Sequence, residues 1–369
     1  MLDDSVFKKL KIIDLSTVLA GPSVGSFFAE LGAQVIKIEN PNQPDVTRSW
    51  KLPSEDKDSS ISAYFSSVNY KKEYLSLNLK ETSDREKLFH LLEDADVLLM
   101  NFKLGDQEKL HIPDERLHEI NPSLIIGKIN GFGADDDRVA YDLILQAETG
   151  IMTMNGTPES GPVKMPVAFI DVLAAHHLKQ GILIELINRS TQSAYQGKTV
   201  SVSLYDAAVS SLINQASNYL MANHIPERIG SLHPNIAPYG ELFTTLDQKT
   251  ITFAIGSNTH FKKLCSFLNA DDLATNPLFS RGQNRVKHRQ ELFEILQRKI
   301  QKFTRNEILD YMHANRVPCG EVKDLKRVFE SQKAQNLIRE EIIDEKLTKR
   351  VTSIAFQTKE SNIMANKEK

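Results

Sequence analysis

Alternating runs of apolar and polar residues along the first part of the chain predict strands and helices that follow one another. Apolar runs rich in β-branched residues, typical of buried strands, lie at 11–15, 35–38, 96–101 and 124–129. Residues 75–79 alternate as a half-buried strand does, and 23–31 and 83–92 have helical spacing. Strands that alternate with helices in this way predict an α/β domain with a Rossmann-like parallel sheet.

The later part of the chain changes character after one more helix and strand. Apolar residues recur every four positions from Ala174 to Leu186, which predicts a helix over 172–188, and 199–204 alternates as a strand. Residues 205–221 have the spacing of a long helix, and turn-forming residues fill 230–240. Beyond them we predict a hairpin at 242–245 and 250–255, and helices at 261–268, 286–303 and 305–314.

These patterns divide the chain into four parts. We predict a large Rossmann-like domain over 1–205, a helical linker over 206–228, a smaller mixed α+β domain over 229–315 and a C-terminal segment over 316–369. A chain of 369 residues is long enough for two domains.

Composition and charge exclude several classes of protein. The net charge is -3, so no global field draws the chain to nucleic acid or to an anionic membrane. Apolar runs such as 181–186 are too short to span a membrane, and the N-terminus lacks an apolar signal core, so we expect a cytoplasmic protein. Cys265 and Cys319 lack the spacing of a disulfide framework or a zinc site, and no metal is predicted.

The turn after the first predicted strand has the composition of a ligand-binding turn. It runs from Val18 to Pro22, where Gly21 allows close approach of the backbone and Pro22 suits the first turn of a helix. The dinucleotide fingerprint GxGxxG is absent, so we do not expect NAD to bind.

Collinear phrases along nearly the whole chain resemble those of family III CoA-transferases, the CaiB/BaiF family. They include IIDLSTVLAGPSVGSFFAELGAQVIKIENP (12–41), YDLILQAETGIM (141–152), DVLAAHHLKQGILIEL (171–186), HPNIAPYGELFTT (233–245) and NRVKHR (284–289). The resemblance implies an enzyme that moves coenzyme A between carboxylic acids. It uses CoA thioesters as substrates and keeps no permanently bound cofactor.

The resemblance further implies that Asp171 is the catalytic nucleophile. Its carboxylate would attack an acyl-CoA, and an aspartyl anhydride and an aspartyl-CoA thioester would follow. The pattern alone favours a cap of the helix that Asp171 begins, as many Asp residues provide, and the family phrase is what favours the nucleophile. A nucleophilic carboxylate must stay ionised, and its ordinary pKa of about 3.9 leaves roughly three units before burial would protonate it at pH 7. We expect the helix start to favour the anion by about 0.3–1 kcal/mol.

Further site residues are carried over from the family or proposed from their position. The resemblance assigns CoA binding to the first turn and to the end of a later strand: Val18, Leu19, Ala20, Gly21, Asn101 and Phe102. Cations placed to meet the phosphates are Arg48, Lys71 and Lys72, with Lys103 and Lys109 as further candidates. The loop 230–240 is the expected active-site loop and contains His233, Asn235 and Tyr239, of which His233 and Tyr239 either touch the substrate or only shape the loop.

Two other functions are open at this point. An α-methylacyl-CoA racemase shares the family phrases but pairs its aspartate with a histidine in an HDxNY phrase. Here Tyr141 occupies the place of that histidine, and with an ordinary pKa near 10 it is a poor proton acceptor. A non-catalytic CoA-binding protein that kept the fold is the second alternative.

The resemblance also bears on assembly and substrate. It implies a homodimer of interlocked subunits, in which the C-terminal segment returns to the large domain. Formyl-CoA transferases have glutamine at the place of Leu19 and a glycine run at the place of HPNIAPYG, so the resemblance favours an acid other than oxalate.

Overall fold

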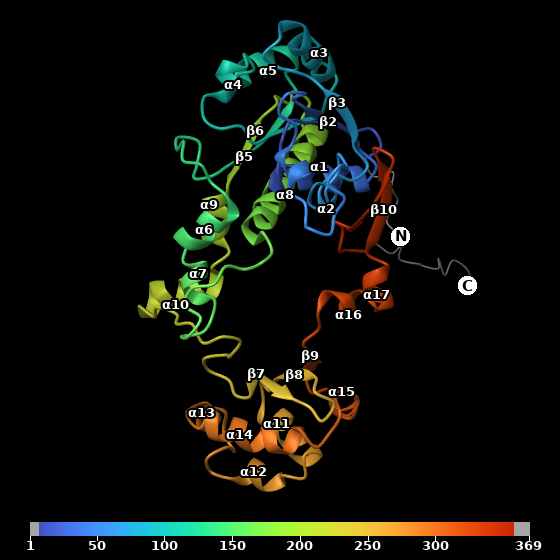
Figure 1. Cartoon of the computed structure of the whole chain (residues 1–369). Coiled ribbons are helices and arrows are strands. Elements are labelled where there is room, and N and C mark those ends of the chain that lie inside the picture. Colours follow the sequence, from blue (N-terminus) through green and yellow to red (C-terminus); the bar gives the residue numbers. More distant parts are fainter. Residues whose placement is uncertain (1–6, 358–369) are drawn as a thin grey trace, which may run out of the picture. The chain divides into compact units, whose positions relative to one another are not determined.

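The computed structural model describes residues 7–357, which form two compact units (Figure 1). Unit 1 contains the described residues up to 152, then 164–225 and 336–357, and unit 2 contains 153–163 and 226–335. This division differs from the expected boundaries: 206–225 belong to unit 1, and the chain re-enters unit 1 at 336 rather than 316. Residues 316–335 remain with unit 2 because they include a strand of its sheet.

Unit 1 is built on a six-stranded sheet in the order β3-β2-β1-β4-β5-β6, with every neighbouring pair parallel. Its strands are β1 (Lys11–Asp14), β2 (Gln34–Glu39), β3 (Glu73–Ser76), β4 (Val97–Met100), β5 (Ile125–Asn130) and β6 (Thr199–Ser203). This confirms the predicted α/β fold with a parallel sheet. The strand expected at 75–79 begins and ends earlier. Leu77 and Leu79, whose alternation extended the prediction, are buried but lie beyond the last residue of β3 that pairs with β2.

Helices cover both faces of this sheet, which explains why its inner strands β1, β2, β4 and β5 are largely apolar and buried, whereas the edge strands β3 and β6 keep exposed residues. Helices α1 (Ala20–Glu30) and α8 (Phe169–Thr191) lie on one face and α3 (Thr82–Leu92) and α5 (Asp114–Ile120) on the other (Figure 1). Successive residues of β1 serve the two faces: Ile12 packs with the first pair of helices and Ile13 with the second.

Unit 1 also contains short elements around this sandwich. They are η1 (Val46–Ser49), α2 (Ala63–Ser67), α4 (Asp106–Lys109), α6 (Asp142–Glu148), α9 (Leu204–Ser210), α10 (Ile213–Ala222) and the hairpin β10 (Ile338–Ile343) with β11 (Lys346–Val351). The short helix α7 (Ile151–Met154) begins in unit 1 and ends in unit 2. The helix expected over 205–221 is therefore two helices, with Ile213 in a left-handed conformation at the break. The C-terminal hairpin packs Ile343 against Ile61 and Phe65 beside α2.

Unit 2 packs helices against a three-stranded antiparallel sheet, β7 (Tyr239–Thr244), β8 (Thr250–Ala254) and β9 (Cys319–Glu321). Its helices are α11 (Asn258–Phe267), α12 (Asp271–Thr275), α13 (Gly282–Lys287), α14 (Arg289–Ile300), α15 (Arg305–Ala314), α16 (Leu325–Phe329) and α17 (Gln332–Gln335). The hairpin β7–β8 confirms the prediction, and the helix expected over 286–303 is divided at His288. The mixed α+β character of this part is thus observed.

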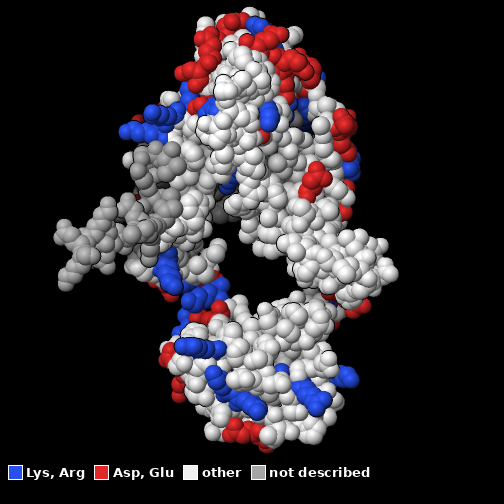
Figure 2. Space-filling view, turned by 180° about the vertical axis from the view of Figure 1, so that it is seen from behind, with Lys and Arg blue, Asp and Glu red and all other residues white. Residues whose placement is uncertain are grey.

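Charge is unevenly spread over the surface. Figure 2 shows one face of the molecule, on which Asp and Glu side chains gather over the end of unit 1 that carries α3 and α5. Exposed members of this group include Glu86, Glu93, Asp94, Glu115 and Glu119. Of the helices in the described part of the chain, none is long and apolar enough to cross a membrane.

Candidate active site

A cavity of about 370 Å³ lies at the carboxyl ends of β1, β4, β5 and β6. Because the strand order reverses between β1 and β4, this is the switch point at which open parallel sheets bind ligands. The sequence-predicted residues that line the cavity are Val18, Leu19, Ala20, Asn101, Phe102, Lys103 and Asp171. The structure therefore brings the first turn, the end of β4 and the expected nucleophile to one place.

Asp171 is the third residue of α8, and a second aspartate fixes the start of that helix. Ala168, at the N-cap position, has no side chain able to accept a hydrogen bond. The cap comes instead from Asp142 of α6, whose Oδ1 accepts from Ile170 N at 2.7 Å and from Asp171 N at 3.4 Å. Asp171 is thus not the cap of its own helix.

The buried Gln146 orients this cap. Its Nε2 donates to Oδ2 of Asp142, and its Oε1 accepts from Met165 N at 2.8 Å. Gln146 is fully buried, so the carboxylate of Asp142 is held by a side chain that cannot turn out to solvent. The structure therefore builds a fixed support around the backbone of the expected nucleophile.

The surroundings of Asp171 make its carboxylate unusually basic. Burial raises the pKa of Asp171 to about 7, and the neighbouring carboxylate of Asp142 adds to the rise. The start of α8 was expected to favour the anion of Asp171. Asp142 occupies this position instead, because its carboxylate accepts hydrogen bonds from the first amides of the helix. Tyr64 lies near the same carboxylates: burial raises its pKa to about 12, with Asp171, Asp142 and Asp45 contributing.

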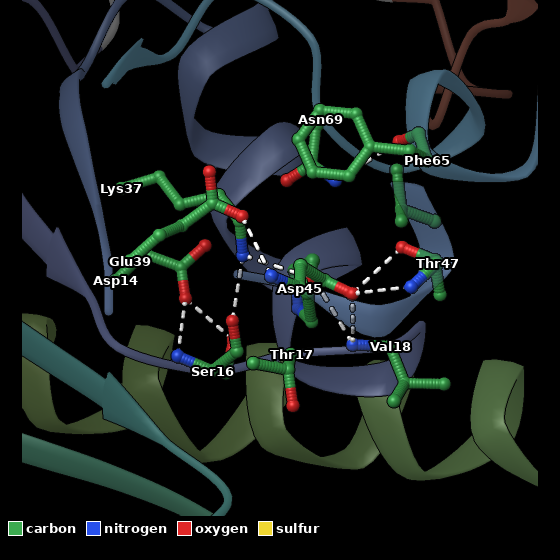
Figure 3. Close-up of polar contacts among 12 residues, drawn as sticks. Asp14, Ser16, Thr17, Val18, Lys37, Glu39, Asp45, Thr47, Phe65 and Asn69 are labelled. Carbon is green, nitrogen blue, oxygen red and sulfur yellow. Dashed lines mark hydrogen bonds and ion pairs between the residues drawn. The ribbon is translucent and has the colours of Figure 1, made fainter. Parts of the chain in front are cut away.

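The turn between β1 and α1 is held by side chains from other elements (Figure 3). Asn101 forms two hydrogen bonds with Thr17: its Oδ1 accepts from Thr17 N at 3.0 Å and its Nδ2 donates to Thr17 O at 2.9 Å. Helix α1 then starts without a side-chain cap or an acidic residue in its first turn. Its first amides are therefore left for a ligand in the cavity.

Gly21 is required for packing, not for contact with the cavity. A Cβ atom at Gly21 would lie 2.4 Å from Cβ and Oγ of Ser16, which is closer than such atoms can approach. Gly21 does not line the cavity. The start of α1 can therefore pack against Ser16 only because residue 21 has no side chain.

A family model described as CoA-transferase family III matches residues 7–365. The chain belongs to CoA-transferase family III. The resemblance seen in the sequence is thereby confirmed, and so, at the level of the family, is the enzyme class CoA-transferase.

Relatives in this family and a solved structure agree with the assignment. A succinate–glutarate CoA-transferase of Agrobacterium fabrum is 32% identical over 332 residues, covering 88% of this chain and 82% of that protein. An acetyl-CoA:oxalate CoA-transferase of Acetobacter aceti is 33% identical, covering 86% of this chain and 81% of that protein. The crystal structure of a CaiB/BaiF family protein from Brucella suis aligns with a TM-score of 0.83 and 31% identity, covering 95% of this chain and 93% of that one.

Lys72, a predicted phosphate ligand, is buried and bound to groups of the core. Its ammonium donates to Asp14 Oδ2 at 2.8 Å, Pro22 O at 2.8 Å and Asn69 Oδ1 at 2.9 Å, which accounts for all three hydrogens. Burial lowers the pKa of Lys72 to about 8, although Asp14 opposes the change. Lys72 does not line the cavity, and its role in binding CoA stays a prediction.

Arg48 and Lys71 also lie outside the lining of the cavity. Arg48 donates Nε and a terminal nitrogen to Glu39, and its guanidinium stacks 3.8 Å from the ring centre of Phe65. The exposed Lys71 has a left-handed backbone whose N–H donates to Glu341 at 2.9 Å. Binding of CoA phosphates by either residue stays a prediction.

Two of the cations that line the cavity are held by acidic neighbours. Lys128 pairs with Asp114 at 2.7 Å. Arg138 pairs with Asp136 and with Glu148, each at 3.1 Å, and stacks 3.6 Å from the ring centre of Phe132. A third lining cation, Lys103, follows Phe102 directly. Sequence position had indicated Lys103 but neither Lys128 nor Arg138.

The expected active-site loop is fixed within unit 2 by two arginines of the phrase NRVKHR. Arg285 donates Nε to Ala237 O at 2.8 Å, and Arg289 donates to the carbonyls of Ile236 and His233. The loop residues themselves interact, since Asn235 N donates to His233 Nδ1 at 3.1 Å and the His233 and Tyr239 rings lie 5.0 Å apart. Their catalytic role stays a prediction.

Asp142, Gln146 and Asp45 are functional candidates that the sequence did not single out. Asp142 stands beside Tyr141 in a family phrase, so its place there was a signal that could have been used. Asp45 and Gln146 act through contacts that no local pattern reveals. Among residues 7–357, no three His, Cys, Asp or Glu side chains are grouped so as to hold a metal ion.

Proposed function

We propose that this enzyme transfers coenzyme A from an acyl-CoA to a carboxylic acid, with Asp171 as the nucleophile. The observation that carries the proposal is a half-buried carboxylate on a ligand-sized cavity at the switch point, with its pKa raised to about 7. A carboxylate of higher pKa is a stronger nucleophile, and at neutral pH about half of it is ionised.

The proposed reaction passes through two anhydrides and one thioester. The Asp171 carboxylate attacks the carbonyl of the donor thioester, and the C–S bond breaks to release CoA thiolate. The thiolate attacks the aspartyl carbonyl of this anhydride, forming aspartyl-CoA and releasing the donor acid. The acceptor carboxylate then displaces the thiolate from aspartyl-CoA. The thiolate finally attacks the acceptor acyl carbon, which completes the product thioester and restores Asp171.

CoA would lie across the switch point, with its reactive end at Asp171. Val18, Leu19, Ala20, Asn101 and Phe102 support this placement because they line the same cavity. Of the described residues that line it, the cations are Lys103, Lys128 and Arg138, so we assign the phosphates to these. Arg48 and Lys72 would act instead as structural supports beneath the turn.

Short dicarboxylic acids are the acceptors to test first. The relatives from Agrobacterium fabrum and Acetobacter aceti are named for succinate with glutarate and for oxalate. Glutarate, succinate and oxalate should therefore be offered to the enzyme with their CoA thioesters, with monocarboxylic acids as the comparison. Transfer is read as the product thioester by mass spectrometry.

Covalent labelling of Asp171 tests the nucleophile. Incubation with an acyl-CoA, followed by hydroxylamine trapping and peptide mass analysis, should place the modification on Asp171. Asp171→Asn should lose both the label and turnover. Asp206→Asn is a matched control, because Asp206 is also the third residue of a helix in unit 1 but is exposed. Turnover without a label, or exchange of an α-proton without transfer, would contradict the proposal.

We also propose that two copies of the chain form a homodimer. Helix α10 contains no buried residue, and its apolar side chains are open to solvent: Ile213 is 73% exposed, Leu220 77% and Met221 87%. A second copy would remove these apolar groups from water. Sedimentation should show a dimer, and Leu220→Glu with Met221→Glu should shift it to monomer. A wild-type monomer at micromolar concentration would exclude the dimer.

A further inference from the structure

Between β1 and α1, both backbone polar groups of Ser16 and of Thr17, and the N–H of Val18, are bound by side chains. Ser16 N donates to Asp14 Oδ1 at 3.0 Å, and Ser16 O accepts from Lys37 Nζ at 2.7 Å. Both polar groups of Thr17 are bound by Asn101. The path of the chain at the cavity wall is thus set by side chains from the end of β1, from β2 and from the residue that follows β4.

Val18 is the residue of this turn with an unfavourable conformation. Its φ is +73°, in the left-handed region that β-branched residues rarely adopt. Its N–H is directed at both carboxylate oxygens of Asp45, at 3.3 and 3.2 Å. Val18 lines the cavity with the two residues that follow it, so the conformation of Val18 sets the direction in which Leu19 and Ala20 enter α1.

Asp45 is itself fixed and buried, with 1% of its surface exposed. Oδ1 accepts from Thr47 N at 3.0 Å and from Thr47 Oγ1 at 2.7 Å. Oδ2 lies 3.2 Å from the ammonium of Lys37, which is fully buried and also binds Ser16 O (Figure 3). One ion pair, Lys37–Asp45, therefore holds the turn at two points, a carbonyl of Ser16 and an amide of Val18.

A second layer holds the segment that carries Asp45. The backbone N–H of Asp45 donates to Glu39 Oε1 at 3.0 Å, and Arg48 donates to both oxygens of the same carboxylate. The guanidinium of Arg48 stacks on Phe65. These contacts join the end of β2 and η1 to the turn after β1, although the elements are separate in sequence.

We propose that Asp45 is a positioning residue of the CoA site, which keeps Val18 in its left-handed conformation and so sets the wall of the cavity where α1 begins. The inference rests on the proposed function, since it concerns binding of the acyl-CoA to this wall. Asp45 does not line the cavity, and it acts through Val18 and Lys37.

A rescue experiment tests this role. Asp45→Ala should lower kcat/KM for the acyl-CoA at least tenfold, mainly through KM, because Val18 then relaxes toward an ordinary conformation. Val18→Gly supplies a residue that adopts positive φ without steric cost. In the V18G background, D45A should therefore change kcat/KM by less than threefold. A loss of the same size in both backgrounds would overturn the proposal.

A second variant separates positioning from loss of a buried charge. D45A leaves the Lys37 ammonium buried and unpaired, whereas K37M/D45L replaces both charged side chains with apolar ones of similar volume. K37M/D45L should fold and still lose at least tenfold in kcat/KM, and adding V18G should restore most of the loss. Full activity of K37M/D45L would also overturn the proposal.

Glu321→Ala is the matched control, because Glu321 is a buried carboxylate that pairs with Arg305 and Arg327 at 2.7 Å in unit 2. It should lower thermal stability without changing KM for the acyl-CoA. Failure of the proposed function would show differently: the wild-type enzyme would give no turnover and no label on Asp171, whatever residue stands at position 45.

Discussion

The aspartates of unit 1 that are wholly or partly buried differ in the charge of their neighbours. Asp14 and Asp45 each face a buried lysine, Lys72 at 2.8 Å and Lys37 at 3.2 Å. Burial alone would raise the pKa of Asp14, but the two lysines hold it below its ordinary value. Within the described part of the chain, the charge that shifts the pKa of Asp171 is another carboxylate, Asp142, and the shift is upward.

The difference separates aspartates that fix geometry from the one that is proposed to react. A lysine beside Asp171 would lower its pKa, weaken it as a nucleophile and occupy the oxygen that must attack. A carboxylate beside Asp45 would leave the turn after β1 without its ion pair. The fold thus places two buried lysines, Lys37 and Lys72, beside the turn after β1, and among the described residues no lysine charge shifts the pKa of Asp171.

The largest effect should come from removing the reactive carboxylate. Asp171→Asn keeps the size of the side chain but cannot form an anhydride, so we expect turnover to fall at least about a thousandfold. Steady-state assays with an acyl-CoA and a dicarboxylate measure the loss. Binding of free CoA, measured by calorimetry, should persist, and residual activity above a few per cent would contradict the assignment.

The sequence predicted the inner strands of unit 1 from continuous apolar runs and the edge strands from alternation, and it predicted Asp171 because a family phrase surrounds it. It could not predict the supports of the site, since these join residues far apart in the chain. Asp142 meets Ile170 across 28 positions, and Lys72 meets Asp14 across 58. Adjacent lysines also look alike in sequence: Lys71 is exposed and Lys72 buried because the backbone turns at Lys71.

Breaking one ion pair should have the next largest effect. Lys72→Met removes the cation that contacts the fully buried Asp14 and leaves it with the more distant Lys37. Removing one partner of a buried ion pair lowers the free energy of unfolding by about 3–5 kcal/mol. Denaturant unfolding, followed by a probe in unit 1, should show this loss in the free energy of unfolding. Lys71→Met is the adjacent control and should cost less than about 1 kcal/mol, because the side chain is exposed. Equal losses in both variants would contradict a structural role for Lys72.

Because of Asp171, the free energy of unfolding should change with pH in the direction opposite to that expected for an ion-paired aspartate. The folded-state pKa of Asp171 lies at about 7, above its ordinary value of 3.8. Protonated Asp171 therefore favours the folded state at low pH, and this contribution is lost as pH rises through 7. Asp171→Asn should become more stable relative to the wild type between pH 4 and 7, by on the order of 3 kcal/mol, and level off above pH 7.

Thermal unfolding of both proteins at pH 5 and pH 8 measures that difference. Asp206→Asn serves as the control, since its exposed carboxylate should give the same difference from the wild type at both values. A constant difference would mean that folding does not shift the pKa of Asp171, and a fall in the relative stability of Asp171→Asn as pH rises would mean that the fold stabilises the anion; either result would contradict the raised pKa.

The smallest effect should come from neutralising the second carboxylate. Asp142→Asn keeps an oxygen for Ile170 N but removes the like charge beside Asp171. Because burial is the larger cause of the raised pKa, we expect the midpoint of the pH profile of kcat/KM to fall from about 7 by only about one unit. The new amide also faces the Gln146 donor, which adds a modest loss at every pH. Asp142→Ala removes the cap as well and should lower activity further, with a similar midpoint. A midpoint that stays at 7 in both variants would show that Asp142 holds the backbone of α8 without setting the basicity of Asp171.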